Sequence, residues 1–171
     1  MEISMKQSTW TLWAVIGAGL AFVAVDQLIK LAALAQLAAI SYRIGISSLW
    51  MDVVLSLNPG AFLSVGQDLP PTVKSVIFLC ALAAVAGVIY WALSRWKQSP
   101  GRSAALYLIA LGGGSNLIDR FFRDGHVVDY LVLNLGSLHT GVFNLADVAI
   151  MAGVAYLALS EFFLKEQKAL A

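Results

Sequence analysis

Acidic and amide side chains gather in one stretch of this chain, between Asn116 and Asp147. Asp119, Asp129 and Asp147 lie there beside some of the most apolar sequence in the protein. A charged side chain at a bilayer centre costs roughly 2.5 to 3.5 kcal/mol on insertion scales, so such groups are candidates for function. Two carboxylates in a poorly solvated site share a proton, and the ionised one can activate water. Asp129 and Asp147 are therefore predicted to form a catalytic pair of the aspartic protease type.

Two other functions stay open on the residues alone. A small transporter could relay protons through the acidic and basic groups of the apolar runs. A scaffold could bind a partner helix through the glycines at 112–114, where missing side chains allow close approach. The polar residues gather towards one face, and the second apolar run is almost free of them, which disfavours a relay. No H-E-x-x-H or comparable ligand spacing is present in the sequence, so neither a metal nor another cofactor is expected.

The composition is that of an integral membrane protein. Of 171 residues, 60% are hydrophobic and 12% are charged. The charged share is about half of that in a typical soluble domain, and the mean hydropathy is +0.80. A net charge of +1 without a clustered basic surface argues against a nucleic-acid partner. With Cys80 as the single cysteine, an intrachain disulfide is excluded as well.

Four apolar runs predict four transmembrane helices in a single domain of residues 1–171. The predicted spans cover about residues 10–39, 73–93, 103–118 and 142–164. A short loop with Arg95, Lys97 and Arg102 follows the second span, and by the positive-inside rule it is cytoplasmic. Both chain termini are then expected in the cytoplasm, and segments of about 40–72 and 121–141 outside it.

Residues 51–57 alternate in part like a short strand, and glycines and prolines around them interrupt any helical period. The predicted fold class is therefore an all-α membrane protein with four transmembrane helices. A small extracytoplasmic β-containing segment is expected between the first and second spans.

Polar residues at helical spacing are expected to surround the catalytic pair. Asp26 and Lys30 are spaced i, i+4, so they can neutralise one another, either as a structural ion pair or as a brace for the site. Asn116, Asp119 and Arg120 share one helix face. The Arg120 guanidinium can hold a carboxylate, a phosphate or a peptide carbonyl, and a loop-stabilising role is the alternative.

Two further pairs complete the set of candidate residues. Asn144 and Asp147 repeat the i, i+3 spacing at the outer end of the fourth predicted span. Asn58 and Gly60 lie in N-P-G-A-F-L-S, which on its own predicts only a turn.

Five short motifs of this chain together resemble those of lipoprotein signal peptidase, also called the signal peptidase II family. They are D-Q-L-I-K at 26–30, N-P-G-A-F-L-S at 58–64, S-N-L-I-D-R at 115–120, V-V-D-Y at 127–130 and F-N-L-A-D at 143–147. Each motif alone is weak, but five in this order in a four-span chain are very specific.

The resemblance implies an aspartic endopeptidase of the bacterial cytoplasmic (inner) membrane. It would remove the signal peptide from diacylglyceryl-modified prolipoproteins, cleaving before the lipidated cysteine at the outer membrane face, without a metal. The partners implied are these signal peptides and membrane lipid, and a monomer is expected. The implied catalytic residues are Asp129 and Asp147, those near the substrate are Asn58, Gly60, Asn116, Arg120 and Asn144, and those that brace the site are Asp26, Lys30 and Asp119.

The chain departs from the family pattern at two places. Ser115 stands where the family usually has glycine, and Leu63 stands where phenylalanine is usual, with Phe62 one position earlier. Both are expected to change the local shape of the pocket without removing a catalytic group.

Overall fold

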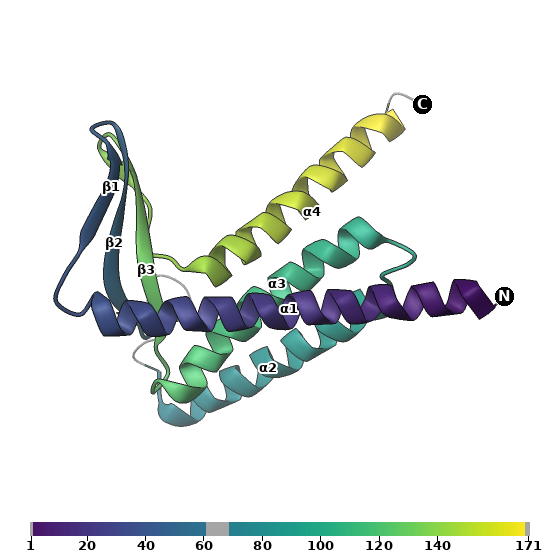
Figure 1. Cartoon of the computed structure of the whole chain (residues 1–171), viewed down its shortest axis with the longest axis horizontal. Helices are drawn as coiled ribbons and strands as arrows, with labels where there is room; N and C mark the ends of the chain where they lie inside the picture. Colours follow the sequence, from purple (N-terminus) through teal and green to yellow (C-terminus); the bar gives the residue numbers. More distant parts are fainter. Residues whose placement is uncertain (1, 61–68, 170–171) are drawn as a thin grey trace.

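The structure, a computed structural model, describes residues 2–60 and 69–169, and the side chains of residues 12–60 and 69–163. The helices are α1 (Glu2–Gln36), α2 (Pro71–Ser94), α3 (Pro100–Phe122) and α4 (Leu145–Ala169). The strands are β1 (Tyr42–Ile46), β2 (Leu49–Asn58), β3 (Val127–Leu135) and β4 (Leu138–His139). The strands stand together at the C-terminal end of α1, and both chain ends lie away from them (Figure 1).

Three of the described helices contain segments long and apolar enough to cross a membrane, as expected of an integral membrane protein. These segments are Leu12–Gln36, Pro71–Ser94 and Leu145–Phe163. The helix α3 is not among them, and the charges of Arg102, Asp119 and Arg120 lower its hydropathy. A helix needs about 20 residues to cross a bilayer core. Since α3 has 23 residues, it is long enough, and that it forms a fourth span stays a prediction.

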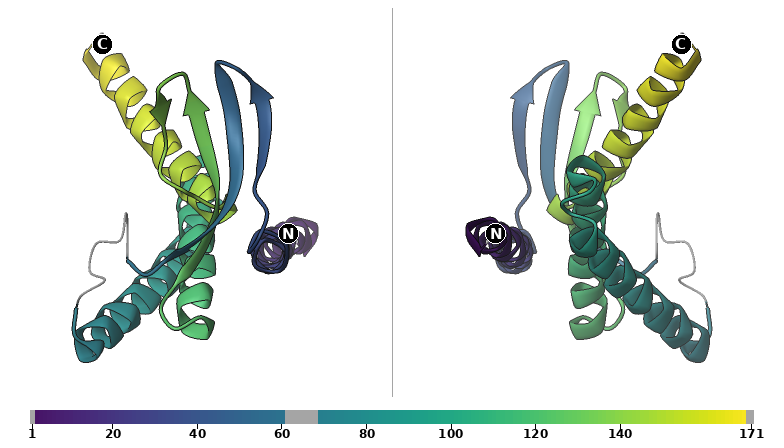
Figure 2. Two further views of the ribbon diagram at one scale, coloured as in Figure 1. Left: turned by 90° about the vertical axis from the view of Figure 1, so that its left-hand side faces the viewer. Right: turned by 90° about the vertical axis from the view of Figure 1, so that its right-hand side faces the viewer.

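The central helix is α3, against which the other three helices pack. In the side views α2 and α4 leave it on opposite sides, and α1 lies beside it (Figure 2). Glycines bring α4 close: a Cβ on Gly112 would lie 2.4 Å from the carbonyl oxygen of Ala146. A Cβ on Gly153 would lie 2.6 Å from the carbonyl oxygen of Ala105. Since both neighbours are backbone atoms, this helix distance requires glycine at both positions.

The sheet is antiparallel, with strand order β1-β2-β3-β4. Aliphatic and β-branched residues dominate β2 and β3, as is typical of half-buried strands. A turn at Gly136, with φ of +57°, leads from β3 to β4. Val128 and Tyr130 of β3 pack against Ala33 of α1 in a small apolar core. This core fixes the sheet to the C-terminal end of α1.

A bulge in β2 adjusts the sheet next to the predicted catalytic residue. The pairing of β2 with β3 shifts in register between Val53 and Ser56. Beyond the shift, Ser56 lies opposite Asp129 and Asn58 lies opposite Val127. Bulges of this kind re-aim side chains at the rims of sheets. Here the result is that β2 ends with Asn58 beside Asp129.

The β-containing segment predicted between the first two spans is confirmed, since β1 and β2 lie between α1 and α2, but the all-α class overlooked the rest of the sheet. Two of the four strands, β3 and β4, come from residues 121–141, which were expected to be a connecting segment. The physical reason is that the apolar run Val127–Leu135 can pair its backbone with β2, whose N–H and C=O groups would otherwise lack partners. The helix ends differ too, since α1 ends at Gln36 and α4 begins at Leu145.

The close α3–α4 contact predicts that Gly112→Ala destabilises the protein. The added methyl group meets the backbone of Ala146, and such overpacking costs about 1 to 3 kcal/mol. Gly113→Ala is the matched control, because its Cβ would lie 3.5 Å from Val85, an ordinary contact. Thermal unfolding in detergent should give a lower Tm for Gly112→Ala and an unchanged or higher Tm for Gly113→Ala. Equal losses for both variants would show that the α3–α4 distance is not the constraint.

Candidate active site

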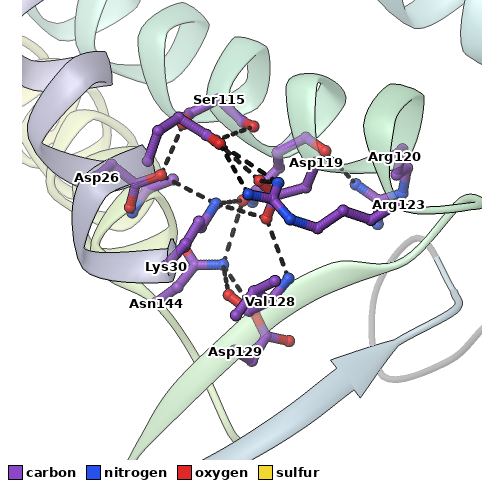
Figure 3. A network of polar contacts seen from close by, with 12 residues as sticks. Asp26, Lys30, Ser115, Asp119, Arg120, Arg123, Val128, Asp129 and Asn144 are labelled. Carbon is purple, nitrogen blue, oxygen red and sulfur yellow. Dashed lines mark hydrogen bonds and ion pairs between the residues drawn. The ribbon is translucent and has the colours of Figure 1, made fainter. Parts of the chain in front are cut away.

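Polar side chains from three helices and the sheet meet in one network at the sheet end of the molecule (Figure 3). Hydrogen bonds and ion pairs connect all ten residues that the sequence singled out. These residues are Asp26, Lys30, Asn58, Gly60, Asn116, Asp119, Arg120, Asp129, Asn144 and Asp147. The sequence pattern therefore identified residues that are neighbours in the folded chain.

Lys30 is the fully buried centre of this network. Its Nζ lies 2.9 Å from Asp26 Oδ2 and 3.0 Å from Asp119 Oδ2. It also donates a hydrogen bond of 2.8 Å to Asn116 Oδ1. An ammonium has three N–H groups, and all three find an acceptor here. The ion pair expected from the i, i+4 spacing of Asp26 and Lys30 is confirmed.

Asp119 joins α3 to β3. Its Oδ2 accepts the backbone N–H of Val128 at 3.0 Å, directly before Asp129. Its Oδ1 accepts Gln27 Nε2 at 2.8 Å and pairs with the guanidinium of Arg123. The carboxylate is fully buried, and burying a charge is costly unless it is paired and hydrogen-bonded. Each oxygen of the Asp119 carboxylate has two such partners, so its charge is both paired and hydrogen-bonded.

Ser115, one of the two departures from the family pattern, braces the network. Its hydroxyl donates to Asp26 Oδ2 at 2.6 Å and accepts Gln27 Nε2 at 3.0 Å. The side chain is fully buried, so it fills space between α1 and α3. The other departure, at Leu63 and Phe62, lies outside the described residues.

The N-terminus of α4 is closed by Asn144 and Asp147. The Asp147 N–H donates to Asn144 Oδ1 at 2.9 Å, and the Asn144 N–H donates to Asp147 Oδ2 at 3.1 Å. This reciprocal arrangement is that of a capping box, and it explains the i, i+3 spacing. The next two N–H groups of the first turn also have partners, since Leu145 donates to Tyr130 Oη and Ala146 donates to Asp26 Oδ1. Both anchors fix the position of Asp147.

Asn144 connects the two predicted catalytic carboxylates. Its backbone N–H binds Asp147, and its side-chain Nδ2 donates to Asp129 Oδ1 at 2.7 Å. The remaining oxygens are held too: Asp129 Oδ2 accepts Asn58 Nδ2 at 3.2 Å, and Asp147 Oδ1 accepts Asn116 Nδ2 at 2.8 Å. Each of these four carboxylate oxygens thus accepts a hydrogen bond from an asparagine of the described part of the chain.

Burial alters the acidity of Asp129, whose residue is 3% exposed. Loss of solvent raises the pKa of its carboxyl to about 6, and the hydrogen bond from Asn58 opposes the rise. The negative charge of Asp147 raises the pKa of Asp129 further. One carboxyl of the pair can therefore hold a proton well above the ordinary range of aspartate.

Arg120 lies at the edge of the network and holds the turn that follows β2. Its guanidinium donates to the carbonyl oxygens of Gly60 and Asn116. The Gly60 N–H in turn donates to Asn58 Oδ1 at 3.0 Å. Arg120 thus uses peptide carbonyls as acceptors, one of the kinds expected from its fork of donors. It links the Asn58 turn to the end of α3.

Sequence reasoning missed Gln27, Arg123 and Tyr130 as members of the site. Arg123 follows Asp119 at i+4 and could have been found by that spacing. Gln27 lies inside the first motif but gives no periodic signal, because it faces α3 from beside Asp26. In the part of the chain that the structure describes, no group of three or more His, Cys, Asp or Glu side chains is arranged to hold a metal ion.

The model of the family described as signal peptidase (SPase) II matches residues 18–163, which include every residue of the network. The chain belongs to the signal peptidase II family. A relative named lipoprotein signal peptidase, from Xylella fastidiosa (strain M12), is 40% identical over 88 residues, or 51% of this chain and 52% of that protein. A relative of the same name from Cellvibrio japonicus (strain Ueda107) is 32% identical over 119 residues, or 70% and 69%.

The match to the Xylella relatives therefore spans about half of their length. Two solved structures, both described as bacterial membrane enzymes studied by the in meso method, share the fold. One has a TM-score of 0.70 and 22% identity, and covers 89% of this chain and 88% of its own. The other has a TM-score of 0.67 and 21% identity, and covers 85% and 90%.

The raised pKa of Asp129 predicts a pH-dependent loss of stability. An unfolded aspartate has a pKa of about 3.9. The stability contributed by the neutral carboxyl is therefore present below that pH and is lost as pH rises through the folded pKa of about 6. An asparagine at position 129 cannot ionise, so the Asp129→Asn variant does not lose this stability as pH rises. Its Tm relative to wild type should therefore rise between about pH 4 and pH 7, measured by thermal unfolding in detergent.

Asp52→Asn is the control, because the opposite pH dependence of its Tm relative to wild type is expected. The hydrogen bond from Arg43 lowers the pKa of Asp52, so the stability that its carboxylate contributes is present at neutral pH and lost on acidification. This variant should lose Tm relative to wild type at neutral pH. A pH-independent difference for Asp129→Asn, or one with the sign of Asp52→Asn, would contradict the burial of a protonated Asp129.

Proposed function

We propose that this chain is an aspartic endopeptidase, a prolipoprotein signal peptidase. It removes the signal peptide from diacylglyceryl-modified prolipoproteins by cleaving before the lipidated cysteine, at the outer face of the bacterial cytoplasmic membrane. Family membership and the relatives named lipoprotein signal peptidase support this proposal. The observation that carries it is that Asn144 holds Asp129 and Asp147 together, with its side chain on one and its backbone on the other.

In the proposed reaction the ionised carboxylate takes a proton from a water, whose oxygen attacks the scissile carbonyl carbon. The protonated carboxyl gives its proton to the carbonyl oxygen, which yields a neutral gem-diol. The diol then collapses: one hydroxyl returns its proton to the pair, the C–N bond breaks, and the amide nitrogen leaves with a proton. The carboxylates end as they began, one ionised and one protonated.

The environments of the two carboxyls favour different roles. Burial and the raised pKa favour Asp129 as the carrier of the shared proton. Asp147, at the third position of α4, lies where a helix N-terminus stabilises negative charge. Its two oxygens also accept N–H donors from Asn116 and Asn144, so we assign the ionised base to Asp147. The pair titrates as a unit, so an apparent pKa from kinetics belongs to both residues.

The proposed membrane arrangement has four spans, with both termini in the cytoplasm. It is supported by the alternating directions of α1, α2, α3 and α4, and by the turn between α2 and α3, which lies on the side of the chain ends (Figure 1). That turn carries Arg95 and Lys97. The carboxylate pair then lies at the opposite, outer side, where the sheet meets the helices.

The relay and scaffold alternatives gain no support from the structure. Among the described side chains, the buried charged residues are Asp26, Lys30, Asp119 and Asp129, and all four belong to the network at the sheet end. A relay needs such groups across the whole bilayer. The glycines at 112–114 face α4 and Val85 of α2 within the chain, so they are occupied by internal packing.

The proposal predicts that Asp129→Asn and Asp147→Asn each abolish cleavage of a diacylglyceryl-modified precursor. Each removes an acid–base group, so a loss of at least about 10³-fold is expected. Asp124→Asn is the matched control: Asp124 is exposed, and its positive φ also suits asparagine. Cleavage is followed by gel shift of the precursor, with the Tm of each variant measured in parallel. Near-full activity of either folded site variant would remove the catalytic assignment.

A shared proton also predicts a bell-shaped dependence of the cleavage rate on pH. The rate should rise as the first carboxyl ionises and fall as the shared proton is lost. The fall should begin near the raised pKa of Asp129, about 6. Rates at precursor concentrations well below KM, which give kcat/KM and so report on the free enzyme, measure both limbs between about pH 4 and pH 9. A rate that rises steadily across this range would exclude the shared proton even if both aspartates prove essential.

A further inference from the structure

The sheet carries an aliphatic face that extends beyond the polar network. Paired residues of antiparallel strands lie on the same face, and successive residues along a strand alternate between the two faces. Ile44, Ile46 and Leu138, on one of these faces, are 65%, 69% and 71% exposed. An exposed apolar patch of this kind marks a surface that binds a protein or a membrane. The strand pairing gathers on this face, without any charged member, Tyr42, Ile44, Ile46, Leu49, Met51, Val53, Leu131, Leu133, Leu135 and Leu138.

The opposite face of the same strands is polar. Asp52 pairs with Arg43 at 2.7 Å, and it accepts hydrogen bonds from Trp50 Nε1 at 3.1 Å and Asn134 Nδ2 at 3.0 Å. His139, the partner of Asn134 in the strand pairing, lies on this face too. An antiparallel sheet commonly turns its polar face to water and its apolar face to a core. Since β1 is exposed throughout, no core of the described chain covers the aliphatic face there.

The sheet lies across the direction of the membrane helices. Its strands overlap in the view of Figure 1 and stand side by side in the left view of Figure 2. In that left view β3 runs upwards, with β4 on its left. Leu131 turns its N–H and C=O away from β2 and to the β4 side, where both bond Phe143. For L-residues this direction puts the side chain on the far face. Leu131 and the aliphatic face therefore point towards the helices.

The position of the aliphatic face restricts what can cover it. The helices α1, α2 and α4 contain apolar segments of membrane-spanning length, and the face points to the side on which these segments lie. A soluble partner that approaches the sheet end from water would meet the polar face first. Val148 and Met151, in the first turns of the α4 segment, are exposed, so lipid surrounds the helix that leaves this side of the sheet. Lipid is therefore the neighbour that the aliphatic face would meet.

We propose that the aliphatic face is a membrane-binding surface, which lies on the lipid leaflet at the sheet end of the helices. β1 is an edge strand, and its free N–H and C=O groups need water or lipid headgroups as partners. The backbone of the sheet therefore lies at the level of the headgroups, and only the aliphatic side chains reach the acyl chains. Asp129 belongs to β3, so this contact sets the height of the carboxylate pair at the membrane surface. The proposal rests on the membrane-spanning helices and is independent of the peptidase reaction.

The matched variants Leu138→Cys and His139→Cys test the proposal. The two residues follow one another in β4, both are exposed, and they lie on opposite faces. Each variant is made in the Cys80→Ser background, because Cys80 is the single cysteine of the chain, and is labelled with a nitroxide. In vesicles of phosphatidylcholine and phosphatidylglycerol, spin relaxation by oxygen, which concentrates in lipid, is compared with relaxation by a water-soluble nickel chelate. The oxygen-to-nickel ratio should be several-fold higher at position 138 than at position 139.

Ile44→Cys repeats the measurement on β1 and should match Leu138→Cys, so the failure of one variant to fold leaves the test in place. Equal ratios at positions 138 and 139 would overturn the proposal. A label at position 138 that is shielded from both reagents and broadened by a second label would also overturn it, because the face would then be an interface between copies. Precursor cleavage by the Cys80→Ser background in the same vesicles distinguishes a failure of this proposal from a failure of the proposed function.

Discussion

The buried ammonium of Lys30 is the interaction on which the rest of the site depends. It lies within 3.0 Å of Asp26, Asp119 and Asn116. One side chain of α1 therefore holds α3 through two acceptors, Asp119 and Asn116, and pairs with Asp26 of its own helix. A lysine buried in an apolar setting is stable only when each N–H is bonded and its charge is balanced. Two carboxylates, Asp26 and Asp119, face two cations, Lys30 and Arg123, so the cluster is neutral as a whole. Removing any one member would leave an uncompensated charge within the apolar part of the molecule.

This neutral cluster positions the carboxylate pair through backbone groups. Asp26 holds the N–H of Ala146, one residue before Asp147, and Asp119 holds the N–H of Val128, one residue before Asp129. The two acids of the cluster therefore each fix the backbone next to one acid of the pair. Such indirect support orients a reacting group more tightly than its own contacts could, because the backbone cannot rotate away. This indirect support also explains why the site combines residues that lie far apart in the sequence and belong to different helices and strands.

The features of the fold and site that could be predicted from the sequence are those that depend on residues close together in the chain. The Asp26–Lys30 ion pair follows from helical spacing, and all ten singled-out residues proved to be neighbours once the chain folded. Half of the sheet was missed, because β2, the partner of β3, lies before α2 and α3 in the chain, and no local period reveals such pairing. Gln27 was missed for the same reason, and so was the bracing role of Ser115, which the sequence marked only as a departure from the family pattern. Their hydrogen bonds join α1 to α3 across 88 positions, so their value appears only with the packing of the two helices.

A hydrolytic site at this place must satisfy two opposed requirements. A raised pKa needs a carboxyl shielded from solvent, whereas hydrolysis needs water and a substrate carbonyl at the same oxygens. The junction of sheet and helices offers a way to satisfy both: Asp129 is buried, and among the described residues its oxygens accept hydrogen bonds from the amides of Asn58 and Asn144. Neutral amides hold a carboxyl without forcing it to ionise, as an arginine or lysine in the same contact would. The asparagines around the pair therefore have a role that the charged residues of the neighbouring cluster could not fill: they hold both acids in place through neutral donors.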